Sequence, residues 1–347
     1  MERVTLGDIA DRTGLSKAAV SQILRGIGRF SDETCKRVRD VAEALHYQPD
    51  PALSALCTHR RQKRLESPTS HQSIAYLTQR DSRHEWKRFR TALEFYDGAR
   101  EQAEKYGYKF EHFWAYDFRS MEHLRKVFLN RGIRGVLISP YIKENGFSDF
   151  NFTGISAVLL ATNFAGVPLH RAQANYFDAM RLLYQKLIGR GYRRIGLILE
   201  NSTDWNTNRF WSSALLLEQE LNSRNGAARL PICREVNREG VKAWVDAHQP
   251  DAVISVKNLL ALLESLGARV PEDLGYARLG VKAGKSHLTG MIHPAGEVGS
   301  AAVDILHKMI CSNETGIPAL PKLVLLPNSW NEGKTIRPLA KNRTDST

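Results

Sequence analysis

The chain has 347 residues, and a usual domain has about 100–200, so two or three domains are expected. Hydrophobic residues make up 42% and charged residues 25%, as in ordinary folded proteins. No run approaches the roughly 18 apolar residues of a membrane helix. The N-terminus carries Asp8 and Asp11 instead of a secretory signal. The four cysteines match no metal-ligand spacing. These features predict a cytoplasmic protein and exclude a membrane protein, a disulfide scaffold and a zinc finger.

Basic residues clearly outnumber acidic ones in this chain. Lys and Arg total 49 and Asp and Glu total 37, which gives a formal net charge of +12. Each basic contact to a phosphate releases a condensed counterion, so this excess favours a polyanionic partner such as nucleic acid. A basic surface that binds nothing is the alternative that charge alone leaves open.

Three short helices are expected within the first fifty residues. The hydroxyl residues that can cap them are Thr5, Ser16 and Ser31. Only Thr13-Gly14-Leu15 separates the first two helices, which indicates a helix-turn-helix. Such a unit places its second helix in the major groove of DNA, with that helix's N-terminal residues over base edges. An all-α headpiece at residues 1–49 follows, although a helical hairpin without a ligand would show the same pattern.

This segment resembles the DNA-binding headpiece of the lactose-repressor/galactose-repressor (LacI/GalR) family. The matching positions are Val4-Thr5-Leu6-x-Asp8-Ile9-Ala10, Gly14-Leu15-Ser16-x-x-Ala19-Val20-Ser21, Ser31-x-x-Thr34-x-x-x-Val38, Ala42, Leu45 and Tyr47-x-Pro49. The resemblance implies that hydroxyl side chains fix the register on DNA phosphates: Thr5, Ser16, Ser21, Ser31, Thr34 and Tyr47. It gives the reading of bases to Lys17, Ala18 and Gln22. Arg25 stands where the family commonly has Asn and adds positive charge to the DNA-binding surface.

Residues 50–71 are expected to form a hinge helix followed by a basic linker. Asp50-Pro51 is a good helix start, and the basic run from His59 to Arg64 follows one apolar turn and a half. A helix this short is marginal in water, so it should form only when something stabilises it. The family's hinge helix orders on operator DNA and inserts a leucine into the minor groove, and Leu56 occupies the matching place. The alternative for the basic run is a solvated linker.

From residue 72 apolar strands alternate with helical segments. Strands are expected at 74–77, 109–114, 136–138, 157–161, 195–199, 252–256, 275–279, 291–292 and 323–326, and long helices at 89–106 and 177–189. This alternation predicts an α/β architecture with parallel sheets flanked by helices. About 270 residues exceed what one such sheet needs, so two similar halves are expected.

This region also resembles the family, whose effector domain looks like a two-lobed periplasmic-binding-protein. The matching segments include Gly98-Ala99-x-x-x-Ala103-x-x-x-Gly107-Tyr108, Arg134-Gly135-Val136-Leu137-Ile138 and Gly191-Tyr192-Arg193-Arg194-Ile195. By the family pattern, residues 72–340 form an effector-binding and dimerisation domain. The first lobe would comprise about 72–166 and 290–320, and the second about 167–289 and 321–340.

Effector-binding residues are expected after the carboxyl ends of the strands, where open parallel sheets bind ligands. The candidates are Trp86, Asn163, Trp205, Arg209 and Lys257. Arg209 matches the arginine with which many family members hold sugar hydroxyls, and the tryptophans could stack on a sugar face unless they pack in a core. Two cations, without the acid that the family often has later in the chain, favour an anionic sugar. Alternatively, Arg209 pairs with Asp204 or Glu200 and orders its loop.

Enzyme and metal motifs are absent, because the chain has no GxSxG, P-loop, HExxH or CxxC and its eleven histidines have no ligand spacing. We therefore expect no enzyme, no cofactor and no metal. The sequence predicts a homodimeric repressor that binds double-stranded operator DNA and is tuned by a carbohydrate or sugar-acid effector, since two half-sites must be held at fixed spacing. The alternatives are a cytoplasmic solute-binding receptor without DNA function, or a regulator controlled by a protein partner.

Overall fold

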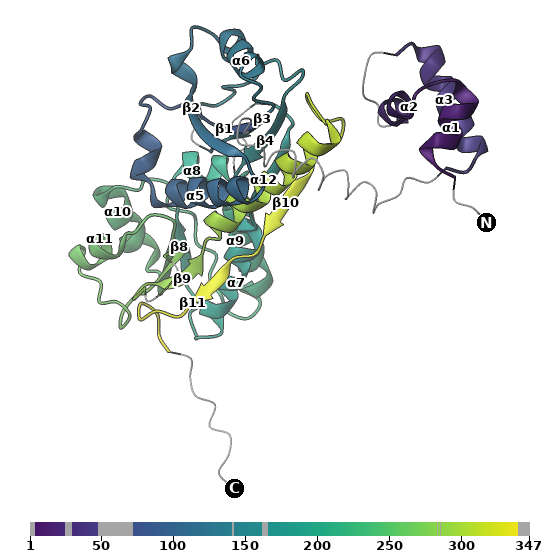
Figure 1. The fold of residues 1–347 in the computed structure, drawn as a ribbon. Coiled ribbons are helices and arrows are strands. Elements are labelled where there is room, and N and C mark those ends of the chain that lie inside the picture. The colour runs from purple at the N-terminus through teal and green to yellow at the C-terminus, as the bar shows by residue number, and fades with distance from the viewer. Residues whose placement is uncertain are drawn as a thin grey trace.

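The computed structural model describes residues 4–24, 30–47, 72–140, 142–161, 166–282, 284 and 286–338. They form a helical headpiece and an α/β region with two sheets, which confirms the predicted fold class (Figure 1). Arg25, Leu56 and Asn163 lie outside the described residues, as does the expected hinge and linker at 50–71. No helix in the described part of the chain is long and apolar enough to cross a bilayer.

The headpiece consists of α1 (Leu6–Thr13), α2 (Lys17–Leu24) and α3 (Asp32–Ala44). One face of each helix contributes to a small core whose buried members are Ile9, Ala10, Val20, Ile23, Val38 and Ala42. These positions recur at helical spacing within each segment, so burying them against one another sets how the three helices pack.

Each of the three helices begins at a hydroxyl cap, as predicted. The side chains of Thr5, Ser16 and Ser31 accept backbone N–H groups at 3.2, 3.1 and 3.3 Å, which satisfies donors that a first helical turn leaves free. Thr5 also forms a capping box with Asp8, whose Oδ2 accepts the Thr5 N–H at 2.6 Å. Gly14 ends α1 with a left-handed φ of +68°, and this allows the tight turn into α2.

A six-stranded parallel sheet forms the first lobe. Its strands in spatial order are β10 (Leu323–Leu326), β5 (His170–Ala174), β4 (Ser156–Leu160), β3 (Gly135–Ile138), β1 (Ser73–Thr78) and β2 (Lys109–Trp114). Alternate side chains of these strands enter two cores, one under α5 (Arg90–Lys105) and α12 (Ala295–Ser312), the other under α6 (Met121–Asn130). Two 3₁₀ helices, η1 (Glu85–Arg88) and η2 (Ala115–Asp117), follow β1 and β2.

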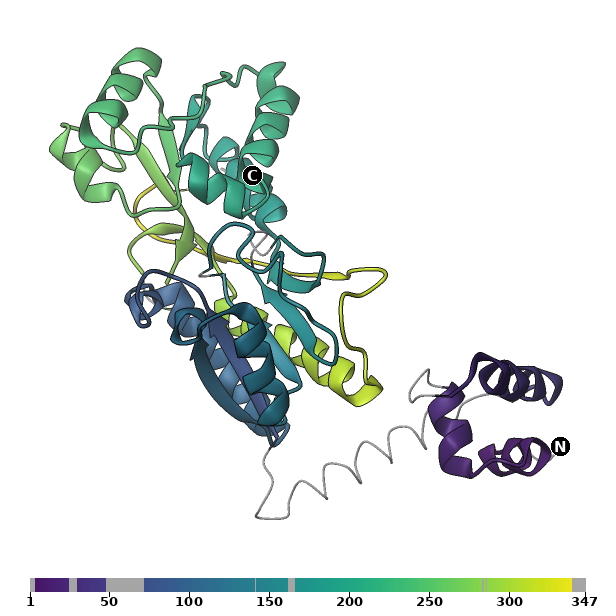
Figure 2. The ribbon, with the colours of Figure 1, turned by 90° about the horizontal axis from the view of Figure 1, so that it is seen from above.

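A five-stranded sheet forms the second lobe, which lies above the first lobe in Figure 2. Its strands in spatial order are β11 (Ser329–Asn331), β9 (Thr289–Ile292), β8 (Gly275–Val281), β7 (Ala252–Ser255) and β6 (Ile195–Ile198), and only the edge strand β11 runs antiparallel. Helices α7 (Tyr176–Ile188) and α9 (Phe210–Ser223) contribute to the core on one face of this sheet. Helices α10 (Arg238–His248) and α11 (Leu260–Ser265) contribute to the core on the other face. Both faces are therefore covered, as expected for parallel strands.

The chain passes between the two sheets after β5, after β9 and after β10. These crossovers lie later in the sequence than the expected boundaries near 166, 290 and 320, which placed β5 and β10 in the second lobe.

Neither β5 nor β11 has the apolar run that marks the other strands. At His170 of β5, which is 2% exposed, hydrogen bonds take the place of apolar packing: Nε2 lies 2.7 Å from Glu314 Oε1, and Nδ1 accepts the Lys322 N–H at 2.8 Å.

Glycines allow α5 and α12 to approach closely on the first lobe. A Cβ atom at Gly98 would lie 2.0 Å from the Gly296 carbonyl oxygen, and one at Gly299 would lie 2.3 Å from the Phe95 carbonyl oxygen. Backbone atoms cannot move aside as the end of a long side chain can. The packing of α12 on α5 therefore returns residues 295–312 to the lobe where the α/β region begins.

We expect Gly98→Ala to lower the free energy of unfolding by about 1–3 kcal/mol, as overpacking commonly does. The overlap with the Gly296 carbonyl should outweigh the gain of up to about 1 kcal/mol that alanine brings to a helix interior. Urea unfolding followed by tryptophan fluorescence measures the change. Gly189→Ala is the matched control, because the nearest atom to its added methyl would lie at 3.4 Å. Equal unfolding midpoints for the two variants would contradict the expectation.

Candidate nucleic-acid interface and ligand pocket

One face of α2 is exposed and carries the residues predicted to read bases. Val20 and Ile23 are 0% and 1% exposed and turn into the headpiece core, whereas the exposed positions are Ser16, Lys17, Ala18 and Gln22. Ala18 and Gln22 are four residues apart and so share a helix face. The outward face of α2 is therefore formed by small or polar side chains and one cation, which suits close approach to base edges in a groove.

The hydroxyl residues predicted to contact phosphates also serve the fold of the headpiece. Thr5 and Ser31 are exposed, while Ser21, Thr34 and Tyr47 are half-buried. The Thr5 hydroxyl lies 2.9 Å from the Asp8 carboxylate, to which it donates, and it accepts the Gly7 N–H. These hydrogen bonds, first from the Thr5 backbone and then from its side chain, lower the pKa of Asp8. A substitution of a cap residue thus acts on helix stability as well as on any phosphate contact.

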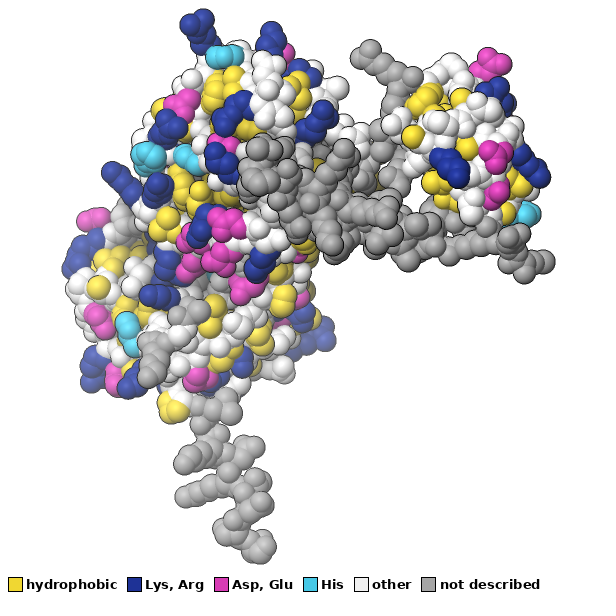
Figure 3. Space-filling view, in the orientation of Figure 1, with side chains coloured by type: hydrophobic (Ala, Val, Ile, Leu, Met, Phe, Trp, Pro, Cys, Tyr) yellow, Lys and Arg dark blue, Asp and Glu magenta, His cyan; other side chains and the backbone are white. Residues whose placement is uncertain are grey.

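Charge is not distributed evenly over the α/β region. Figure 3 shows acidic side chains gathered over α5 (Figure 3), where a groove of about 730 Å³ is lined by Glu94, Asp97, Glu101 and Glu297 together with Arg90 and Lys105. The positive excess of the whole chain therefore does not extend over this face. A surface that carries more acids than bases would repel DNA, so we do not place the nucleic-acid interface there.

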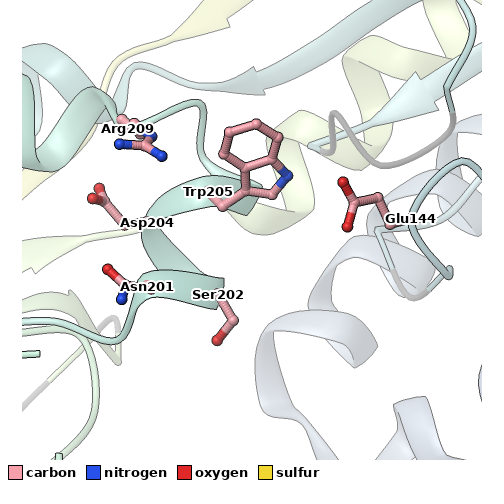
Figure 4. A pocket seen from close by; sticks show the side chains of 6 residues that line it. All are labelled: Glu144, Asn201, Ser202, Asp204, Trp205 and Arg209. Carbon is pink, nitrogen blue, oxygen red and sulfur yellow. The ribbon is translucent and has the colours of Figure 1, made fainter. Parts of the chain in front are cut away.

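A cavity of about 560 Å³ lies where the second-lobe sheet ends, beside α8 (Asn201–Asn206). Its lining residues are Glu144, Asn201, Ser202, Asp204, Trp205 and Arg209 (Figure 4). Five of these six follow the carboxyl end of β6, which is the position that the parallel-sheet rule predicts for a ligand. Glu144 comes from a turn of the first lobe, so the pocket has walls from both lobes.

The backbone before α9 holds Arg209 in an unusual conformation. Asn208 and Arg209 have φ values of +56° and +57°, in the left-handed region that residues other than glycine rarely adopt. The Arg209 guanidinium carbon lies 5.4 Å from the centroid of the Trp205 ring, as in a cation–π contact. Trp205 is itself 48% exposed. Strained residues often mark functional sites, and here the strain at Arg209 places a cation beside the Trp205 ring in the wall of the pocket.

The acids that could have paired with Arg209 are paired with other cations. Arg234 lies 2.9 Å from Asp204, and Lys257 lies 2.5 Å from Glu200. The alternative in which Arg209 pairs with one of these acids is thus not what the structure shows. Lys257 does not line the pocket, and its charge is offset by Glu200, so the expectation of a second cation there needs correction.

The structure places Trp86 in the core of the first lobe, not in the pocket. It is 2% exposed, and its ring centroid lies 5.6 Å from Tyr76, 5.0 Å from Tyr96 and 5.3 Å from His112. Burial, with smaller contributions from nearby positive charges, lowers the pKa of His112 to about 4. The neutral imidazole therefore completes a cluster of aromatic rings, and packing explains this tryptophan better than effector binding does.

The pocket is more acidic than the sequence predicts. Glu144 and Asp204 line it against the single cation Arg209, and these two acids were not among the candidates. Asp204 stands in the loop that the strand pattern marks, so its position could have been found, whereas no local pattern marks Glu144. This lining does not support a preference for an anionic ligand. Within the residues described, no group of three or more His, Cys, Asp or Glu side chains could hold a metal ion.

The capped headpiece and the pocket between two lobes together define a helix-turn-helix protein with a ligand-binding region of the periplasmic-binding type. Residues 5–50 match "Bacterial regulatory proteins, lacI family", and residues 184–336 match "Periplasmic binding protein-like domain". The chain thus combines a lacI-family headpiece with a periplasmic-binding-protein-like domain and is a DNA-binding transcriptional regulator, in agreement with the resemblance seen in the sequence. The curated relatives and solved structures that it matches include transcriptional regulators.

Among curated relatives, the transcriptional regulator KdgR of Bacillus subtilis (strain 168) is 21% identical over 334 residues, which cover 90% of this chain and 93% of KdgR. The match to the transcriptional regulator GntR of Pseudomonas aeruginosa is 39% identical but spans 56 residues, 16% of each chain. Among solved structures, the CelR–cellobiose complex is 17% identical with a TM-score of 0.57, covering 96% of this chain and 100% of CelR. The lac repressor dimer bound to operator and the anti-inducer ONPF is 16% identical with a TM-score of 0.53, covering 96% and 99%. These structural matches show a shared fold.

We expect Thr5→Ala to destabilise α1 by about 1 kcal/mol, because it removes the cap acceptor and the hydroxyl that donates to Asp8. Thr5→Asn keeps an acceptor and should recover most of this loss. Hydrogen exchange of the full chain, followed by mass spectrometry, should show faster exchange at residues 6–13 in Thr5→Ala only. Thr153→Ala, an exposed position in the first lobe, is the control, and identical exchange in all variants would show that the cap does not stabilise the helix.

Proposed function

We propose that this regulator is a homodimeric repressor whose affinity for operator DNA is tuned by a small carbohydrate in the pocket lined by Glu144 and Arg209. The observation that carries this proposal is the presence, in one chain, of an exposed α2 face on a lacI-family headpiece and of a polar pocket with an aromatic wall between two lobes. Operator DNA lies in the bacterial cytoplasm, so the protein is proposed to act there.

Operator recognition is proposed to divide into base reading and phosphate contact. Lys17, Ala18 and Gln22 on α2 would read base edges, with Arg25 adding a contact at the end of the same helix. The phosphate contacts would come from Thr5, Ser16, Ser21, Ser31, Thr34 and Tyr47. Leu56 of the hinge segment would enter the minor groove, as the family resemblance implies.

A dimer is proposed because one small headpiece offers few base contacts. Two headpieces held at a fixed spacing bind two half-sites, and the second binding event is then effectively intramolecular. The lac repressor, to which this chain is similar in fold, was solved as a dimer on its operator. The α/β region would hold the two subunits together.

The effector is proposed to be a carbohydrate bound through Trp205 and Arg209. A half-exposed indole can stack on the apolar face of a sugar ring, and a guanidinium can donate paired hydrogen bonds to neighbouring hydroxyls. CelR, a similar structure, was solved with cellobiose. Because the pocket has walls from both lobes, a ligand there would favour one arrangement of the lobes over another. We propose that this arrangement also sets how the two headpieces are placed, so that linkage couples effector binding to DNA affinity.

Replacing Gln22 by Ala should change which operator sequence is preferred, because a side chain that reads a base edge contributes about 1–3 kcal/mol of discrimination. Selection of binding sites from a random DNA library, performed on the full chain, measures this preference. Thr34→Ala is the matched comparison and should weaken binding to all sequences about equally, since phosphate contacts carry no sequence information. If both variants keep the wild-type consensus and affinity, α2 does not read the operator.

Arg209→Ala should weaken carbohydrate binding at least tenfold, about 1.4 kcal/mol, because the pocket loses its paired donors. Isothermal calorimetry with cellobiose and glucose measures the affinity, and a gel-shift assay with the selected operator measures the effect on DNA binding. Arg269→Ala is the control, since Arg269 is paired with Asp273 outside the pocket. Unchanged sugar affinity in Arg209→Ala would remove this arginine from the site.

A further inference from the structure

Asp204 is the buried acid of the pocket, and its two carboxylate oxygens have different surroundings. The residue is 3% exposed and lies on α8. Its Oδ2 accepts a hydrogen bond from Arg234 Nη1 at 2.9 Å, whereas Oδ1 is buried and has no hydrogen-bond partner among the described residues. A buried oxygen without a donor costs free energy relative to a paired one, so this atom calls for an explanation.

The neighbours of this carboxylate are polar and belong to the pocket. Figure 4 shows Asn201, Asp204 and Arg209 projecting to one side of α8, while Trp205 extends toward Glu144 (Figure 4). Arg209 does not form an ion pair with Asp204, and its guanidinium rests near the Trp205 ring instead. A cation and an acceptor without a donor therefore lie next to each other in the same wall.

We propose that Asp204 Oδ1 accepts a hydrogen bond from the effector, and that the effector presents a hydroxyl or an ammonium group at this point. Arg234 holds the other oxygen, which keeps the carboxylate in place as an acceptor. This inference rests on the proposed function, because it names the chemistry of the ligand in the same pocket. It also makes Asp204 a specificity-determining residue, a role that the sequence did not indicate.

The ligand must offer an acceptor to Arg209 and a donor to Asp204, and this requirement distinguishes between carbohydrates. A sugar hydroxyl can accept from Arg209 and donate to Asp204, so neighbouring hydroxyls of a neutral pyranose satisfy both groups. A carboxylate can only accept, so a sugar acid that places its carboxylate on Arg209 would leave Asp204 without a donor at that point and would add a like charge close to it. Glu144 on the opposite wall adds further negative charge. The site therefore takes a neutral or amino sugar in preference to the corresponding sugar acid.

The variant Asp204→Asn tests this proposal with little change of shape. Arg234 carries donors only, so the amide oxygen should turn toward it and the amide NH₂ toward the pocket. The acceptor that faces the ligand thus becomes a donor. Glucose and glucosamine should bind at least about tenfold more weakly to the variant, whereas glucuronate, whose carboxylate is an acceptor, should bind more tightly than it binds to the wild type.

Calorimetry on the full chain with glucose, glucosamine and glucuronate measures these affinities. Asp246→Asn is the matched control, because this substitution makes the same change in charge outside the pocket, where Asp246 is paired with Lys242 on α10. It should leave all three affinities unchanged. A gain in glucuronate binding by Asp204→Asn cannot come from a misfolded variant, so the test does not depend on equal stability.

Two results would overturn the inference while leaving the proposed function in place. In the first, Arg209→Ala weakens sugar binding but Asp204→Asn does not. In the second, the wild type binds glucuronate more tightly than glucose. A wild type that binds none of the three probes would also overturn it. In that case operator binding by the same samples still reports on the DNA-binding part of the proposed function. Weakened glucose and strengthened glucuronate binding together support the assignment.

Discussion

Parallel strand pairing is the constraint on which the ligand pocket depends. In a parallel sheet all carboxyl ends lie at one edge, so the loops that follow them gather in one place. The segment after β6 supplies Asn201, Asp204, Trp205 and Arg209 to the pocket, and the first lobe supplies Glu144. The pocket therefore depends on how each sheet is assembled. The first is complete only because α12 and β10 return to it, and the close packing of α12 on α5 at Gly98 makes that return possible.

The elements that could be predicted from sequence are those whose own residues carry the signal. The headpiece caps are hydroxyls next to helical apolar spacing, and central strands such as β1 and β3 are buried on both faces and so read as apolar runs. Strands β5 and β11 lack this signal. His170 of β5 is buried because Glu314 and Lys322, far along the chain, provide its hydrogen bonds, and no local pattern can show such partners. The expected lobe boundary was also wrong at β5.

The candidate pocket lies where the strand pattern predicts a ligand, but its charge differs from the expected charge, for a related reason. Residue type shows that a loop contains cations, but only the fold shows which of them remain unpaired. Glu200 offsets Lys257, whereas Arg209 is left beside Trp205. Trp86 illustrates the same limit for an aromatic residue. Its place after a strand suggested that it stacks on a ligand, but neighbouring rings bury it in the core of the first lobe. Pairing across long sequence separations therefore decides the electrostatics of this pocket.

The crossover after β9 packs against side chains of both lobes. His293 lies there, with Nε2 3.4 Å from the Tyr176 hydroxyl of the second lobe and its ring 5.5 Å from the Phe95 ring of the first. Burial lowers the pKa of His293 to about 4, so the imidazole stays neutral near pH 7 and packs as an uncharged ring. Densely packed side chains shift between discrete arrangements more readily than they deform continuously. A change in the angle between the lobes would therefore require these rings to repack, and a ligand can drive such a change only by as much as it binds one arrangement more tightly than the other.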